Sequence, residues 1–253
     1  MISLSNFLTE ASSTKEKALQ AFNKDFGHNG DLENDLITIS GDDALGYEIS
    51  YNGNLIIRKG AKTLTNKYYK LGEVKSMYIY QCNKISSLEG LPRKIEDLTI
   101  EKCPMISSLD GAQNSEIKNL NIRGCKNFTS LIGCPKDLDS FSFYPATIHD
   151  RGIDNFQGLP KHMKGDFNVI SGVNSYEGMP EVIDGDFFFT VYKNMTGKLP
   201  KKIGGDAYIK FYGGCSFDTH PGLEYIGGKF VTNKADDIES VGIKVKGKIV
   251  QES

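Results

Sequence analysis

The residue types that most often carry catalysis show no catalytic spacing in this chain of 253 residues. A zinc protease would show a His-Glu-x-x-His run, and a serine hydrolase would show Gly-x-Ser-x-Gly around its nucleophile. Neither pattern occurs in the sequence. The histidines share no spacing and fall in predicted turns: His28, His149, His162 and His220. We therefore expect solvated loop histidines, a protein that is not an enzyme, and no cofactor.

Three of the five cysteines recur at nearly constant intervals. Cys82, Cys103 and Cys125 are 21 and 22 residues apart, whereas Cys134 and Cys215 do not fit the series. A structural zinc site needs paired Cys-x-x-Cys ligands, which the sequence lacks. The series therefore predicts a ladder of small buried thiols and no metal site. An odd number of cysteines without paired spacing also favours a reducing compartment over a disulfide framework.

Three aspartates recur every 20 residues, at Asp166, Asp186 and Asp206. If they occupy the same position in stacked repeats, their carboxylates lie about 5 Å apart, which is the distance between neighbouring strands. Like charges at that distance repel, so each carboxylate needs hydrogen bonds, solvent or a cation. We expect hydrogen bonds from nearby backbone N–H groups, as in aspartate turns, and a bound divalent cation is the alternative.

These series belong to an internal repeat. The pattern apolar-x-x-apolar-x-apolar-x-x-Cys-x-x-apolar-x-x-Leu starts at Val74 and starts again at Ile95 and Ile117. Later units are marked by a Pro that is followed three residues later by an apolar residue. About eight short repeats start near residues 74, 95, 117, 138, 163, 183, 203 and 226. The alternating apolar pairs predict one short strand per repeat, with turns or single 3₁₀ turns on the return path. The sequence therefore predicts a mainly β solenoid.

Residues 1–73 do not show the repeat and are expected to cap its first layer. Ser13-Thr14-Lys15-Glu16 is a capping box, which predicts a short amphipathic helix that ends at Gly27. Asn52-Gly53 lies between two alternating runs and predicts the turn of a β-hairpin. We expect one continuous domain, with a helix-plus-hairpin cap at 1–73 and the solenoid at 74–253.

The repeats resemble the short leucine-rich repeats of bacterial and bacteriophage proteins over roughly residues 74–250. The resemblance implies a leucine-rich-repeat-type solenoid that binds another protein on its concave sheet face. The chain departs from the pattern at Asp236-Asp237-Ile238-Glu239-Ser240, which is expected to form a degenerate C-terminal capping unit.

The N-terminus resembles the capsid-targeting leader of internal head proteins of large contractile-tailed phages. The resemblance rests on Leu8, Glu10 and Ala11, and it implies cleavage after Glu10. The alternative is the frayed start of a helix with Ile2, Leu4, Phe7 and Leu8 on one face. The resemblance implies a location in the cytoplasm of a bacterial host, or packaging in a phage virion.

Composition excludes several other classes. The formal net charge of −2 gives no basic field for nucleic acid, and Lys and Arg do not align along the outward strand positions. No stretch approaches the roughly 20 apolar residues of a membrane span, and the N-terminus lacks a basic segment before an apolar one. We therefore expect no membrane association, no nucleic-acid binding and no secretory signal.

The outward strand positions carry more aromatic residues than an unused solvated face would. Tyr and Arg are also the residue types enriched at binding hot spots. The candidate partner-binding residues are Tyr78, Tyr80, Glu101, Arg123, Tyr144, Asn168, Phe188, Tyr208 and Lys210. The competing interpretation is that these aromatic residues only stabilise the sheet through cross-strand pairs.

These patterns favour a non-catalytic protein-binding solenoid that engages a host or virion protein as a monomer. The alternative is a structural or assembly protein of the virion that self-associates through its caps or its N-terminal segment. The sequence does not identify the partner.

Overall fold

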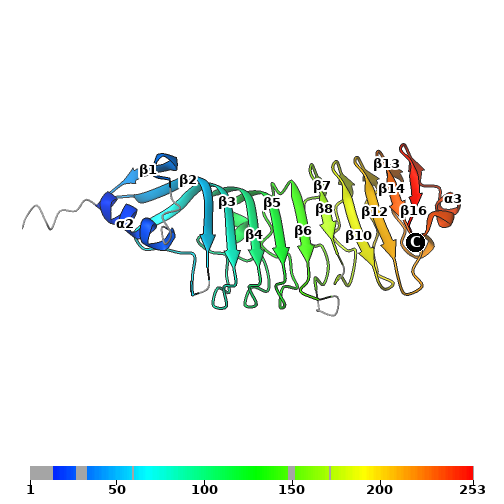
Figure 1. Cartoon of the computed structure of the whole chain (residues 1–253), viewed down its shortest axis with the longest axis horizontal. Coiled ribbons are helices and arrows are strands. Elements are labelled where there is room, and N and C mark those ends of the chain that lie inside the picture. Colours follow the sequence, from blue (N-terminus) through cyan, green and yellow to red (C-terminus); the bar gives the residue numbers. More distant parts are fainter. Residues whose placement is uncertain (1–13, 27–32, 59, 148–151, 171, 253) are drawn as a thin grey trace, which may run out of the picture.

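The computed structural model describes residues 14–26, 33–58, 60–147, 152–170 and 172–252. The protein is mainly β, with one N-terminal helix and a β-solenoid of about nine turns. It is elongated, with the helix α2 (Thr14–Phe26) at one end and strand β16 (Ile249–Gln251) at the other (Figure 1).

One sheet of 11 strands runs the length of the molecule, and only its first pair is antiparallel. We call the side of this sheet that faces away from the core the outer face. In spatial order the strands are β1 (Ile37–Asp42), β2 (Gly46–Ile57), β3 (Tyr69–Tyr80), β4 (Lys94–Glu101), β5 (Glu116–Arg123), β6 (Ser140–Tyr144), β8 (Phe167–Val169), β10 (Phe187–Val191), β12 (Ala207–Phe211), β14 (Phe230–Thr232) and β16.

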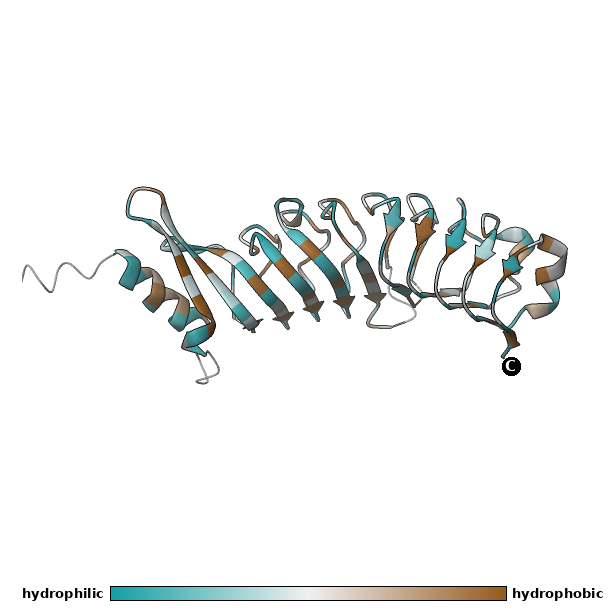
Figure 2. Ribbon diagram, turned by 90° about the horizontal axis from the view of Figure 1, so that it is seen from above, coloured by the Kyte–Doolittle hydropathy of each residue, from teal (hydrophilic) through white to brown (hydrophobic). Residues whose placement is uncertain are grey.

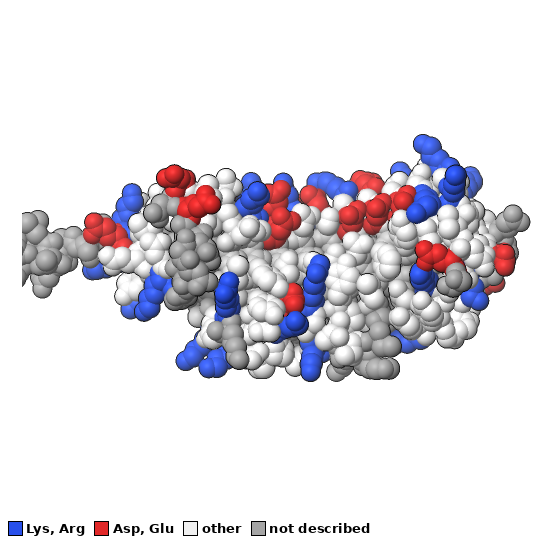
Figure 3. Space-filling model, in the orientation of Figure 1, with Lys and Arg blue, Asp and Glu red and all other residues white. Residues whose placement is uncertain are grey.

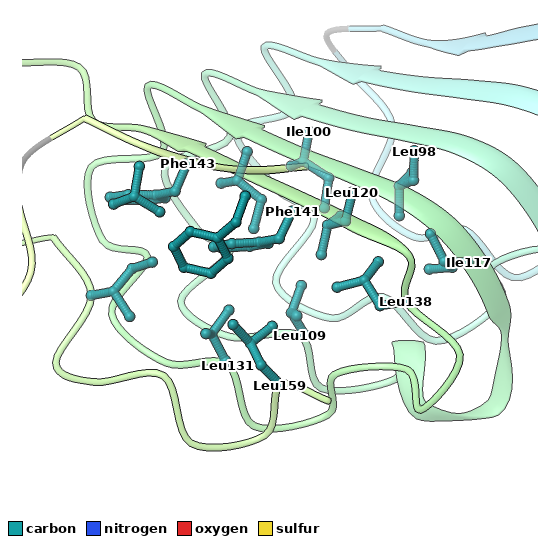
Figure 4. Close-up of a cluster of buried hydrophobic side chains, with 14 of the residues drawn as sticks. Leu98, Ile100, Leu109, Ile117, Leu120, Leu131, Leu138, Phe141, Phe143 and Leu159 are labelled. Atoms are coloured by element: carbon teal, nitrogen blue, oxygen red, sulfur yellow. The ribbon is translucent and has the colours of Figure 1, made fainter. Parts of the chain in front are cut away.

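The register of the parallel strands confirms the repeat that the sequence predicts. Met77 lies opposite Leu98, Leu98 lies opposite Leu120, and Leu120 lies opposite Phe141. These side chains point into one continuous core (Figure 4), and each is at most 2% exposed. Burying an apolar side chain of this size stabilises a fold by about 1.5–3 kcal/mol. Figure 2 shows the resulting alternation of brown and teal residues along the longer strands.

A second sheet, of five two-residue strands, accompanies the C-terminal repeats along one edge of the large sheet (Figures 1 and 2). Its strands, in chain order, are β7 (His162–Met163), β9 (Val182–Ile183), β11 (Lys202–Ile203), β13 (Tyr225–Ile226) and β15 (Lys244–Val245). From Met163 onward a Gly-Asp corner interrupts each repeat's strand, at Gly165-Asp166, Gly185-Asp186 and Gly205-Asp206, so the repeat gains a second short strand.

The return path contains turns and short helices, as the repeat length predicts. Its helical segments are η2 (Ala112–Asn114), η3 (Phe217–Thr219), η4 (Ala235–Asp237) and α3 (Ile238–Val241). The corners before the recurring prolines need a backbone that only glycine adopts without strain. Gly90 has φ +94°, and a Cβ there would lie 2.7 Å from the carbonyl carbon of Leu64 in the preceding turn.

The helix α2 covers the N-terminal end of the core. Its buried residues are Ala18 and Phe22, which lie four positions apart and therefore share one face. The ring of Phe22 lies 6.3 Å from that of Tyr51 and 5.7 Å from that of Tyr69, measured between centroids. This aromatic cluster places α2 against β2 and β3.

The hairpin turn predicted at Asn52-Gly53 is wrong. Both residues lie inside the continuous strand β2, and the chain reverses between β1 and β2, before Gly46. Parallel pairing of Leu55 with Met77 and of Ile57 with Ile79 buries apolar side chains, which outweighs the local turn preference. The extra residue at Asn52-Gly53 is accommodated as a bulge in the pairing with β3.

The expected boundary between residues 73 and 74 falls inside β3, because β3 begins at Tyr69. Parallel pairing starts one strand earlier still, between β2 and β3. The N-terminal segment and the repeats therefore share one sheet.

Replacing Gly185 with Ala should destabilise the fold through the Gly-Asp corner. The added Cβ would lie 2.4 Å from Oδ1 of Asp166 and 2.6 Å from the carbonyl carbon of Gly165. We expect Gly185→Ala to lower the free energy of unfolding by about 2–3 kcal/mol in urea titrations. The control is Gly214→Ala, where φ is +81° and no heavy atom lies within 4 Å of the added Cβ, so only backbone strain of about 1 kcal/mol remains. Equal losses for the two variants would contradict the tight packing of the corner.

Candidate functional site

The outer face of the large sheet carries two columns of side chains, because every second residue of a strand points to the same side. Pairing between strands aligns the first column as Tyr78, Thr99, Asn121, Ser142, Asn168, Phe188 and Tyr208. The second column contains Tyr80, Glu101, Arg123 and Tyr144, and continues at Thr190 and Lys210. All nine candidate residues therefore lie on one face, where they are half-buried apart from the exposed Arg123.

The N-terminal end of this face is an aromatic and charged group on β3 and β4. The rings of Tyr78 and Tyr80 stack with centroids 5.4 Å apart. The hydroxyl of Tyr78 donates a hydrogen bond of 2.5 Å to Oε2 of Glu101, and Nζ of Lys102 lies 3.3 Å from Oε1 of the same carboxylate. Burial and the bond to Glu101 raise the pKa of Tyr78 to about 12. The hydrogen bond holds the ring of Tyr78, and stacking together with the cation of Lys102 holds the ring of Tyr80.

The middle of the face is polar. The guanidinium of Arg123 lies 5.1 Å from the ring centroid of Tyr144, and its Nε donates to Oδ1 of Asn121 at 3.0 Å. Beside it, Nδ2 of Asn168 donates to Oγ of Ser142 at 3.5 Å. Charged side chains gather along the upper and lower borders in Figure 3, and few lie in the middle.

The C-terminal end of the face is a second aromatic group. The rings of Phe188 and Tyr208 stack with centroids 6.0 Å apart, and Nζ of Lys229 lies 5.0 Å from the centroid of Tyr208. Lys210 forms an ion pair of 2.5 Å with Glu252, which raises the pKa of Lys210. Two aromatic groups thus flank the polar middle.

The sequence analysis missed a third exposed aromatic pair. Tyr192 and Tyr212 are each 43% exposed, and their rings stack almost parallel, at 12°, with centroids 5.0 Å apart. They directly follow the last residues of β10 and β12, Val191 and Phe211. Continuing the alternation by one step beyond Thr190 and Lys210 would have found them.

The aspartate ladder has a structural role. Oδ1 of Asp166 accepts from the backbone N–H of Asp186 at 2.8 Å, and Oδ1 of Asp186 accepts from that of Asp206 at 2.7 Å. Oδ1 of Asp206 accepts from the N–H of Lys229 at 2.7 Å. The predicted backbone donors are therefore correct, but they belong to the next repeat and not to a local turn. Each carboxylate joins two consecutive turns.

The cysteine ladder is buried as predicted. Cys82, Cys103 and Cys125 are at most 3% exposed, and their thiols lie within 3.3–3.7 Å of backbone carbonyl oxygens. Burial also raises the pKa of the separate Cys134 to about 12. Among the described residues, no three or more His, Cys, Asp or Glu side chains are grouped to hold a metal ion.

The histidines only partly follow the sequence interpretation. His162 is exposed, with Nε2 2.8 Å from Oδ2 of Asp184. His220, expected in solvent, is only 1% exposed, because its Nδ1 bonds the carbonyl oxygen of Ser216 at 2.7 Å and its ring packs 5.6 Å from that of Tyr176. His28, His149 and the predicted processing site at Leu8, Glu10 and Ala11 lie outside the described residues.

Hollows in the described surface lie away from the outer face. One of about 350 Å³ is lined by Tyr176, Met179 and Leu199 beneath a rim of lysines and glutamates. Another, of about 360 Å³, lies beside Leu64, Tyr69 and Leu91 near the N-terminal end. A third, of about 280 Å³, is lined by Asp218, His220 and Leu223.

Comparisons with protein-family models, with curated proteins and with solved structures found no match. In the part of the chain that is described, no helix is long and apolar enough to cross a membrane. The arguments about function therefore rest on the site itself.

Substitutions of Asp186 test whether its carboxylate accepts a hydrogen bond from a backbone N–H or binds a cation. Asp186→Ala removes the acceptor for the N–H of Asp206 and should lower the free energy of unfolding by about 1 kcal/mol. Asp186→Asn keeps a side-chain oxygen that can accept the same bond, so it should lose clearly less. Urea unfolding of both variants measures the difference. An Asn variant as unstable as the Ala variant would contradict the acceptor role.

The ionisation of Tyr78 reports its bond to Glu101. Its pKa in the folded protein, about 12, is above the value of about 10 expected in the unfolded chain. Burial of the neutral hydroxyl and its bond to Glu101 therefore contribute stability that is fully present below pH 10 and is lost as the pH rises from about 10 to about 12. Glu101→Gln should shift the pKa of Tyr78 toward 10, measured as the phenolate absorbance that disappears in a matched Tyr78→Phe variant. An unchanged titration would contradict the bond.

Proposed function

We propose that this protein is a non-catalytic, leucine-rich-repeat-type solenoid that binds a protein partner through the outer face of its large sheet. The observation that carries the proposal is the pair of aromatic groups, Tyr78 with Tyr80 and Phe188 with Tyr208, that flank the cation of Arg123 on one surface. Aromatic residues and arginine are enriched at binding hot spots, whereas solvated sheet faces favour small polar and charged residues.

The rigidity of this face supports the proposal. Backbone pairing fixes every strand on both sides, and stacking, cation contacts and hydrogen bonds hold the side chains. A preformed surface loses little conformational freedom when it binds, so less of the interaction energy is spent on ordering. This explains how a largely polar face with few aromatic anchors can bind a folded partner.

The dimensions of the face also suit a protein partner. Six steps between neighbouring strands separate β3 from β12, which corresponds to about 29 Å at about 4.8 Å per step. A standard interface buries about 800 Å² on each partner and would occupy most of such a surface. A small metabolite would contact only one of the aromatic groups.

Arg123 indicates part of the partner's chemistry. A guanidinium has five N–H donors in a planar fork, and in Arg123 the Nε–H donates to Asn121. The terminal nitrogens suit a carboxylate or backbone carbonyls of the partner. Apolar or aromatic side chains of the partner would pack against the two flanking groups.

We place this activity in a bacterial host. The short repeats and the Leu8-Thr9-Glu10-Ala11 leader support a phage-encoded protein that acts on a host protein in the cytoplasm, or on a virion protein with which it is packaged. The alternative is a structural protein that self-associates through its caps or N-terminal segment. The exposed Ile249 (47%) and Val250 (38%) on the last strand favour this alternative.

The test is affinity capture from host lysate and from virions, with identification by mass spectrometry. We expect wild type to retain a partner that is lost by the triple variant Tyr78→Ala, Arg123→Ala, Tyr208→Ala, because three anchors of the face are removed. The matched control is Tyr68→Ala, Lys202→Ala, Tyr225→Ala, which removes two aromatic side chains and one cationic side chain that are not outer-face candidates. Lys202 contacts Tyr225, and Tyr68 contacts Lys67.

The control variant should retain the partner, and all three proteins should give the same circular dichroism spectrum. Recovery of the same proteins by wild type and by the outer-face variant would contradict the proposal. The outer-face residues would then serve only to stabilise the sheet.

A further inference from the structure

The strand β16 forms the C-terminal edge of the large sheet and pairs on one side with β14. All three of its residues are exposed, including the apolar Ile249 and Val250. The strand β1, at the other edge, differs, because its apolar residues Ile37 and Ile39 are partly buried against the core. Exposed apolar edge strands are templates for pairing with another chain.

Alternate residues of β16 point their backbone N–H and C=O groups toward the open edge of the sheet. The carbonyl of Lys248 accepts from the N–H of Phe230, and the N–H of Glu252 donates to the carbonyl of Thr232. Because the direction of the backbone groups alternates along a strand, the groups of Lys248, Val250 and Glu252 face β14. The N–H and C=O groups of Ile249 and Gln251 therefore point away from the sheet, toward the open edge.

One antiparallel register pairs this edge with a second copy of itself. When Val250 lies opposite Val250 of the second copy, Ile249 lies opposite Gln251 and Gln251 lies opposite Ile249. Both pairs then consist of residues whose backbone groups point toward the partner, so each pair exchanges two hydrogen bonds. A shift by one residue would place an outward residue opposite an inward one and lose these bonds.

The charges of the strand are complementary in the same register. Lys248 lies opposite Glu252 of the second copy, and Glu252 lies opposite Lys248. These are positions without backbone bonds between the strands, where opposing side chains come closest. Lys248 is exposed, and the side chain of Glu252 is 45% exposed although it also contacts Lys210. Opposite charges therefore face each other on both sides of the central Val250 pair.

We propose that β16 docks a second copy of this chain, and that two copies join antiparallel through residues 248–252. The resulting two-fold axis is perpendicular to the sheet, so both outer faces lie on the same side of the dimer. The helix α3 lies at the same end and extends beyond β16 along the long axis (Figure 1), so the two α3 helices lie near the junction. The dimer goes beyond the proposed function, because none of Ile249, Val250 and Gln251 is an outer-face candidate. Only Glu252, next to the strand, contacts one of the candidates, Lys210.

Reciprocal charge variants test this pairing. Wild type at about 100 µM should sediment with about twice the mass of the 28.0 kDa chain. Lys248→Glu places Glu opposite Glu252, and Glu252→Lys places Lys opposite Lys248, so each variant alone should be a monomer. An equimolar mixture restores opposite charges at both positions and should form a heterodimer. Lys246→Glu makes the same charge change outside β16 and should leave the wild-type dimer intact.

A variant that lacks one backbone hydrogen-bond donor tests the pairing independently of charge. Gln251→Pro removes an outward N–H while preserving pairing with β14, so it should also be a monomer with an unchanged thermal unfolding midpoint. A monomeric wild type, dimeric single charge variants, or a mixture that fails to associate would each overturn the proposal. Partner capture by the outer face is scored with Gln251→Pro, which leaves Lys210 and Glu252 unchanged, so the two proposals fail independently.

Discussion

The rest of the structure depends on stacking like positions of consecutive turns in register. Each strand buries its apolar pair between the same positions of its two neighbours, as Leu98 does between Met77 and Leu120. A slip by one residue would turn these side chains to the outer face, so burial fixes the register along the whole sheet. Stacking in register also explains the glycines at the corners, because consecutive turns approach too closely there for a larger side chain.

The stacking that builds the core also organises the outer face. Each outward side chain lies about 4.8 Å from its counterpart in the next turn, so rings, cations and hydrogen-bonding groups form columns. The same contacts can therefore serve both stability and the proposed binding. Stacking holds Phe188 against Tyr208 and helps the sheet, and it also gives both rings the fixed positions on which the proposal depends. The first and last turns have a neighbouring turn on one side only. The helix α2 lies at one of these ends, and the α3 region lies at the other.

Much of the fold could be predicted from the sequence, because residues that recur at the repeat spacing lie side by side in consecutive turns. The spacing of Cys82, Cys103 and Cys125 and of the three aspartates gave the correct alignment of turns. The turn at Asn52-Gly53 was wrong, because local turn preference cannot show that a later strand will pair along the whole of β2. The burial of His220 was also missed, since it depends on packing against Tyr176 from another turn.

The candidate site was predictable in its alternation but not in its contacts. Alternating positions placed all nine residues on one face, yet the bond from Tyr78 to Glu101 and the cation of Lys229 over Tyr208 come from neighbouring strands and need the actual geometry. Tyr192 and Tyr212 were missed because they lie beyond the positions counted as strand.

The most direct test of binding through the outer face is hydroxyl-radical footprinting of the protein bound to the partner that it captures. The structure predicts that Tyr78, Tyr144, Phe188 and Tyr208 become less reactive in the complex, while Tyr68 and Tyr225 react as in the free protein. Protection of Tyr68 or Tyr225, with unchanged reactivity on the outer face, would contradict the account.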